Sequence, residues 1–260
     1  MNRYLETYMP NLRPETFSTY QTYYLTQPRS TPKPGKFSYS NTNFTFLGLI
    51  TEAITSSSAV SQIRKRILSP LNLRRTWMEG FEPNPFPDLN ILPGRYHWAS
   101  DTFRSTAGIC PLFKHPESRP DLIDACLSNT SVEWTAGGYL SHPSDIAALG
   151  LAIRNKDQRV ISPASWDIMH DFISDSPESP IEVGHGIFRI KRGNGKWLGH
   201  DGSVLGFAGT LFWAEERDVV GSVLGNVGTM HAGKVSSAAD FSRKEDFLEL
   251  VVKLGKLHED

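Results

Sequence analysis

Hydrophobic residues recur at steps of three and four along four stretches of the chain, which is the spacing of amphipathic helices. The first helix is expected to begin at Asn41–Asn43, which are candidate N-caps, and Pro70 is expected to end the second. The third and fourth open at Pro143 and Pro163, because a proline in the first turn has no hydrogen bond to lose. The apolar positions are Phe46, Leu47, Leu49, Ile50, Ala53 and Ile54; Val60, Ile63, Ile67 and Leu68; Ile146, Leu149 and Ile153; and Trp166, Met169 and Phe172.

A different pattern runs from about His185 to Asn226, where short β-branched and aromatic runs alternate with turn residues. The sequence Gly193-Asn194-Gly195 supplies a tight turn between two of these runs. We therefore predict an antiparallel meander, followed by a C-terminal helix. The apolar stripe of that closing helix is Phe247, Leu250, Val251, Leu254 and Leu257.

Helices, then antiparallel strands, then a closing helix predict an α+β fold. We expect a single domain over residues 1–260, with a mainly helical lobe at 37–180 and a sheet with the C-terminal helix at 181–260. Proline-rich stretches at 28–35 and 83–93 are expected to be loops.

Charge and composition exclude several classes of function. With 27 Lys and Arg against 28 Asp and Glu, the net charge is −1, so the chain lacks the basic excess that nucleic-acid binding requires. No apolar run is long enough to span a membrane, and the N-terminus lacks the apolar core of a signal peptide. As written, the chain is therefore expected to be cytoplasmic. The native compartment stays open, because a missing N-terminus would take any targeting signal with it. The eight histidines show no ligand spacing, so no metal site is predicted.

Two cysteines, Cys110 and Cys126, are too few for a disulfide framework. We interpret them as reduced packing residues, and a single bridge between them stays open.

Three separated segments carry candidate chemistry. The first is Pro34–Asn43, which contains Tyr39-Ser40-Asn41 and leads directly into a helix. The second is Trp134–Ser141 with the helix after it, and the third is Gly199–Phe207. In this order they resemble the Tyr-x-Asn element, the Gly-Gly segment and the third motif of the serine β-lactamase and penicillin-binding-protein superfamily. The resemblance is to its branch of class C-like esterases, D-aminopeptidases and acyltransferases, and it covers about residues 15–226.

This resemblance implies a β-lactamase/transpeptidase-like fold and acyl transfer through a serine ester. The expected reaction is hydrolysis or transesterification of an ester, amide or lactam, with a small-molecule or peptide acyl substrate and no metal or organic cofactor. The loops from Glu79 to Asn129 contain no readable motif. The substrate is therefore not predicted, and neither is the oligomeric state.

The resemblance also assigns roles to individual residues. Tyr39 would exchange a proton with the attacking or leaving oxygen, which requires cations that depress its pKa. His200 would steer the phenol, and Asn41 would hold the substrate carbonyl or a lysine. The backbone N–H of Ser203 would form half of an oxyanion hole, and Gly202 would leave room for the acyl group. Four of these residues also have a purely structural interpretation. Tyr39 would be a half-buried core aromatic, Asn41 a helix cap, His200 a strand residue with satisfied hydrogen bonds and Gly202 a bulge.

The nucleophile motif of the superfamily, Ser-x-x-Lys, is the missing part. Its one match before Tyr39 is Ser30–Lys33, in a proline-rich loop where a helical turn is disfavoured, so we reject it as the nucleophile. The chain thus resembles the C-terminal two thirds of such an enzyme, without its nucleophile helix, first sheet strands and N-terminal helix. We expect the remaining lobes to expose apolar faces.

Three explanations stay open for this chain. It is a fragment or truncated gene model of a serine hydrolase, a degenerate member that binds without catalysis, or an active enzyme with a rearranged site. The alternative function, from another class, is a noncatalytic recognition or scaffold protein that retains the cleft.

Overall fold

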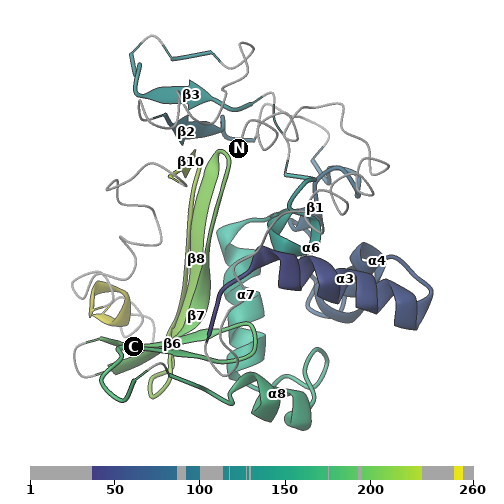
Figure 1. Ribbon diagram of the computed structural model, residues 1–260, viewed down its shortest axis with the longest axis vertical. Helices are drawn as coiled ribbons and strands as arrows, with labels where there is room; N and C mark the ends of the chain where they lie inside the picture. The colour runs from purple at the N-terminus through teal and green to yellow at the C-terminus, as the bar shows by residue number, and fades with distance from the viewer. Residues whose placement is uncertain are drawn as a thin grey trace.

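The computed structural model describes residues 37–86, 92–99, 114–116, 118–126, 128, 130–174, 176–192, 195–229 and 249–253 (Figure 1). Its helical elements lie beside a long antiparallel sheet. They are α3 (Asn41–Thr55), α4 (Ala59–Ile63), the π-helical turn η2 (Arg64–Leu68), α6 (Trp134–Gly137), α7 (Pro143–Arg154) and α8 (Pro163–Met169). All four predicted helical stretches are confirmed, the second as α4 continued by η2.

Local signals explain where these helices begin. Pro143 and Pro163 occupy the first turns of α7 and α8, as the sequence predicts, and the preceding residues cap them. The Ser162 hydroxyl accepts a hydrogen bond from the backbone N–H of Ser165 at 3.1 Å.

The predicted N-cap of α3 was wrong. Asn41 is already the first helical residue, and Ser40, with φ −150° and ψ 118°, is the cap. The backbone carbonyl of Ser40 accepts a hydrogen bond from the N–H of Asn43, which fixes the start of the helix. The cap interpretation of Asn41 therefore does not hold.

The main sheet has five antiparallel strands in the order β5-β6-β7-β8-β9, which confirms the predicted meander. Arg192 pairs with Gly195 at the end of the β6–β7 hairpin. The turn residues of this hairpin, Gly193 and Asn194, lie outside the described residues. The strand β5 was not predicted. The strands are β5 (Ile181–Val183), β6 (Phe188–Arg192), β7 (Gly195–Val204), β8 (Phe207–Ala214) and β9 (Val220–Gly225).

Two small sheets complete the α+β fold, and the sequence did not predict them. One pairs β1 (Trp77–Met78) with β4 (Tyr139–Leu140), and the other has the order β10-β2-β3. Strands of two or three residues are too short to show an alternating pattern. The second sheet consists of β10 (Val227–Gly228), β2 (Tyr96–Trp98) and β3 (Leu122–Asp124).

The main sheet is the middle layer of the described structure. One face packs against α7 and α8, through a buried cluster of Ile187, Leu198 and Trp213. The other face carries Trp197 and Phe212, which pack against Val252 of the helical segment 249–253. That segment is the described part of the predicted closing helix, and Phe247, Leu254 and Leu257 lie outside the described residues.

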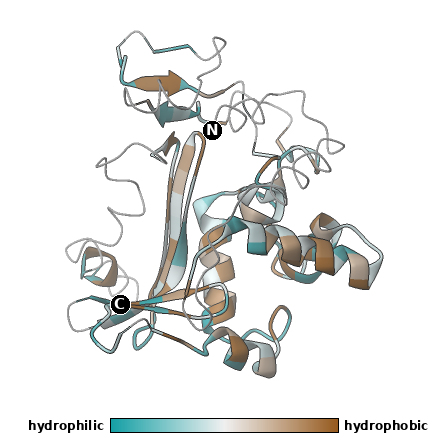
Figure 2. Ribbon diagram, in the orientation of Figure 1, coloured by the Kyte–Doolittle hydropathy of each residue, from teal (hydrophilic) through white to brown (hydrophobic). Residues whose placement is uncertain are grey.

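Part of the apolar stripe of α3 faces outward. Leu47, Ile50 and Ile54 are 56%, 50% and 77% exposed, and Figure 2 shows hydrophobic residues along this helix. The buried side of α3 is instead occupied by Gly48, while the partly buried Leu49 packs against a core cluster.

Among the described residues, no helix is both long and apolar enough to cross a bilayer. Cys126 is an exposed free thiol, whereas Cys110 lies outside the described residues, so their predicted state is not tested.

Gly199 is the glycine on which the β7–β8 pairing depends most directly. Its φ is +153°, and a β-carbon there would lie 2.0 Å from the carbonyl oxygen of Leu211. We expect Gly199→Ala to lower the free energy of unfolding by about 3 kcal/mol, measured by urea denaturation. Gly202→Ala is the control on the same strand, because nothing lies within 4 Å of its added carbon. Equal stability of the two variants would contradict this explanation.

Candidate active site

Tyr39 and His200 come from distant parts of the chain and lie side by side. Tyr39 precedes α3 by two residues, and His200 is in the second half of β7. Their ring centroids are 6.1 Å apart, with the planes inclined at 43°. Phe188 of β6 lies on the histidine as well, at 4.9 Å between centroids. The phenol is only half-buried, so it is accessible at the surface between α3 and the sheet.

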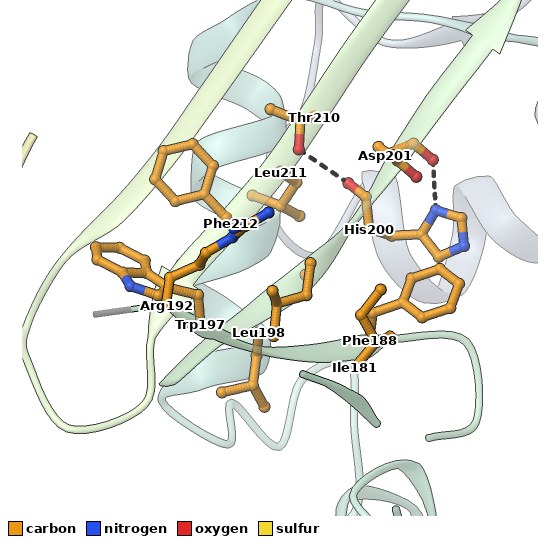
Figure 3. Close-up of a pocket in the computed structure, with 12 residues that line it drawn as sticks. Ile181, Phe188, Arg192, Trp197, Leu198, His200, Asp201, Thr210, Leu211 and Phe212 are labelled. Atoms are coloured by element: carbon orange, nitrogen blue, oxygen red, sulfur yellow. Dashed lines mark hydrogen bonds between the residues drawn. The ribbon is translucent and has the colours of Figure 1, made fainter. Parts of the chain in front are cut away.

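The orientation of His200 is set by its own strand. Its Nδ1 is hydrogen-bonded to the backbone carbonyl of Asp201, as the close-up in Figure 3 shows. A carbonyl only accepts, so Nδ1 is the protonated nitrogen and Nε2 is the acceptor in the neutral ring. The Thr210 hydroxyl donates to the carbonyl of His200 at 3.4 Å.

Gly202 and Ser203 lie near the end of β7, where one side of the strand is open. They pair with Gly209 and Ala208 of β8, and both are exposed. On the other side, β6 pairs with β7 no further than Gly199, so β7 beyond this residue has no partner on that side among the described strands.

The hairpin register sets the direction of the Ser203 backbone. Val204 and Phe207 close a two-residue turn, and pairs in an antiparallel ladder alternate between those that exchange hydrogen bonds and those that do not. Ser203–Ala208 is therefore the non-exchanging type. The Ser203 N–H points away from β8, toward the open edge.

Asn41 begins α3 two residues after Tyr39 and is exposed. Its backbone carbonyl accepts a hydrogen bond from the Thr45 hydroxyl at 3.5 Å, within the helix. Asn41 thus lies at the same helix terminus as Tyr39, two residues away.

The Gly-Gly segment lies against the first turn of α3 and close to the end of β7. The Thr135 hydroxyl donates to the carbonyl of Phe44 in α3 at 2.9 Å. A β-carbon on Gly137 would lie 3.8 Å from a methyl group of Val204, at the end of β7. The three segments that the sequence singled out thus meet around one place.

One residue of the candidate site was not predicted from the sequence, the buried carboxylate Glu133. It is 7% exposed and immediately precedes Trp134, whose φ of +39° is unusual for a residue with a side chain. Burial raises the pKa of the Tyr39 phenol above its usual value, and the charge of Glu133 raises it further. This direction is opposite to the shift that a tyrosine base requires.

An apolar cavity of about 150 Å³ lies beside His200, on the sheet face that carries Trp197 and Phe212 (Figure 3). Phe188 and His200, which both line the cavity, also contact each other, and His200 contacts Tyr39. The cavity is lined by Ile181, Phe188, Ile190, Arg192, Trp197, Leu198, Gly199, His200, Asp201, Thr210, Leu211 and Phe212.

The described residues contain no group of three or more His, Cys, Asp or Glu side chains that could hold a metal ion. Ser30 and Lys33, the rejected nucleophile match, lie outside the described residues.

Solved structures with the same fold are amidases and penicillin-binding-protein homologues. The D-amino acid amidase from Ochrobactrum anthropi SV3, complexed with D-phenylalanine, has a TM-score of 0.65 and 22% identity, over 79% of this chain and 56% of the amidase. A D-stereospecific amidohydrolase from Streptomyces sp. gives 0.64 and 20%, over 87% and 63%. The octameric penicillin-binding protein homologue from Pyrococcus abyssi gives 0.60 and 20%, over 85% and 44%.

This chain thus spans little more than half the length of that D-amino acid amidase. Comparison with curated protein sequences gives no match. A family model described as Beta-lactamase matches residues 5–240, which is most of the chain. The chain therefore belongs to the beta-lactamase family, within the serine β-lactamase and penicillin-binding-protein superfamily.

Proposed function

We propose that this chain carries the tyrosine, histidine and oxyanion parts of a serine-type acyl-transfer site for a small amide or ester. The observation that carries the proposal is the 6.1 Å approach of the Tyr39 and His200 rings, at the open edge of β7. Acyl transfer is the chemistry of the superfamily to which the chain belongs. An amide is favoured as substrate because structural neighbours of this chain are named as amidases.

In the proposed reaction, a serine oxygen attacks the substrate carbonyl and its proton passes to Tyr39, which must be in its phenolate form at this step. The carbonyl oxygen becomes negative and is stabilised by the Ser203 N–H. The C–N or C–O bond then breaks as Tyr39 returns the proton to the leaving group, and water hydrolyses the serine ester. Asn41 would orient the carbonyl. The attacking serine is not identified among the described residues, and Ser203 acts only through its backbone N–H.

The electrostatics favour Tyr39 as a proton donor rather than as a base. With its pKa raised, the phenol is protonated near neutral pH and ready to donate to a leaving group. Acting as a base would require a cation close to its oxygen, to offset burial and Glu133.

A covalent probe tests whether this chain supplies the nucleophile. We expect a fluorophosphonate to label an active enzyme at one serine, with one probe per chain, as measured by mass spectrometry with site mapping. Calorimetry on the same sample measures the binding of the neutral amide phenylacetamide. Binding without labelling would favour the noncatalytic recognition function. Neither labelling nor binding would refute the proposed site.

Replacing Glu133 tests the electrostatics of the phenol. Glu133→Gln removes a negative charge that opposes the phenolate, so the pKa of Tyr39 should fall toward its usual value. The measurement is an NMR titration of ¹³C-labelled tyrosine rings, with Tyr39→Phe to assign the signal. Where turnover is measurable, the limb of its pH profile that follows the Tyr39 titration should move to lower pH in the same variant. A Tyr39 titration unchanged by the substitution would contradict the coupling.

Gly202 tests the space for the acyl group. Because nothing lies within 4 Å of a β-carbon at this position, Gly202→Val should fold normally. Its side chain should nevertheless weaken phenylacetamide binding roughly tenfold by occupying the approach to β7. Calorimetric titration checks this, with Gly202→Ala as the intermediate case. Undiminished binding by a folded Gly202→Val protein would place the ligand elsewhere.

A further inference from the structure

The loop segment 130–138 is closed at its neck by one residue, Glu79, through its carboxylate at one end and its backbone N–H at the other. Its Oε2 accepts hydrogen bonds from the backbone N–H of Thr130 at 2.6 Å and from the Thr130 hydroxyl at 3.1 Å. At the other end of the loop, the carbonyl of Gly138 accepts from the Glu79 N–H at 3.2 Å. The Thr130 hydroxyl oxygen also lies 3.2 Å from this carbonyl, so its one hydrogen is shared between the carbonyl and Glu79 Oε2. Both ends of the loop are therefore tied to a single residue after β1.

Arg95 connects this neck to the turn that ends β7. Its guanidinium forms a two-point ion pair with Glu79, one contact being 2.9 Å, and donates to the carbonyl of Ser128 at 2.8 Å. The same guanidinium lies 5.4 Å from the ring centroid of Phe207. A β-carbon on Gly206 would come within 2.9 Å of Arg95 Cβ, so the turn is seated directly on the arginine.

The residues inside this loop are the ones that face the candidate site. The charge of Glu133 raises the pKa of the Tyr39 phenol, and the Thr135 hydroxyl donates to the carbonyl of Phe44 in α3. A β-carbon on Gly137 would be in van der Waals contact with Val204. A shift of the neck would therefore move these three contacts together.

Because the Arg95–Glu79 pair is largely buried, its main contribution is orientation rather than stability. The side chains of Arg95 and Glu79 are 12% and 17% exposed, and desolvating two charges offsets most of their attraction. What a two-point arginine–carboxylate pair provides reliably is orientation. We propose that Glu79 and Arg95 are positioning residues, which hold loop 130–138 in register with the end of β7. This inference rests on the proposed function of the site.

Two variants test this role without leaving a lone buried charge. Arg95→Lys keeps the charge and loses the two-point geometry, and the double variant E79Q/R95M removes both charges. In either one, we expect phenylacetamide to bind roughly tenfold or more weakly, at temperatures where the protein is folded. The Tyr39 pKa should also fall, in the direction produced by Glu133→Gln, because the loop no longer holds the carboxylate in place. Calorimetry and the ¹³C-tyrosine titration measure the two effects.

The Arg189–Glu182 pair of the main sheet is the matched control. Its side chains are 21% and 20% exposed, and its guanidinium lies 3.9 Å from the ring centroid of Phe172. Arg189→Lys should leave ligand affinity and the Tyr39 titration unchanged. Folded Arg95 variants with wild-type affinity and titration would show a purely structural pair and overturn the inference. Failure of the unaltered protein to bind phenylacetamide would instead refute the proposed function, while the Tyr39 titration still decides the role of the pair.

Discussion

The candidate site exists because α3 approaches α6 more closely than a β-carbon would allow. At Gly48, such a carbon would lie 2.7 Å from the Trp134 ring and 2.5 Å from the Thr135 hydroxyl. This approach brings the first turn of α3 toward the sheet, where Tyr39 meets His200. A larger residue at Gly48 would push the helix away and separate the two rings, although it contacts neither of them.

Around the phenol, charge and burial act in the same direction. Glu133 and partial desolvation both favour the protonated form of Tyr39. His200, held through its Nδ1, presents a fixed edge rather than a freely rotating ring. The described residues therefore favour a protonated phenol beside a histidine ring of fixed orientation. A role as base depends on a positive group arriving with the substrate or from another part of the protein.

The sequence was informative where the signal was local. Pro143 and Pro163 mark helix starts through their own backbone chemistry, and the strands of the meander are long enough to show their pattern. The cap of α3 moved to Ser40 because several adjacent polar residues compete for that role. Glu133 could not be predicted, since its importance comes from its electrostatic effect on Tyr39, 94 positions earlier in the chain.

The open edge of β7 sets a limit on the length of what it can hold. Beyond Gly199, the strand continues only to Val204 before the turn at Leu205 and Gly206. Outward-facing backbone groups recur at every second residue, here Asp201 and Ser203, and so are roughly 7 Å apart. The Asp201 carbonyl already accepts a hydrogen bond from His200 Nδ1. An extended ligand could therefore be gripped by its main chain over about two residues. Under the proposed function, this edge would hold a compound the size of an amino acid derivative or a dipeptide, and a longer peptide would gain little from its additional length.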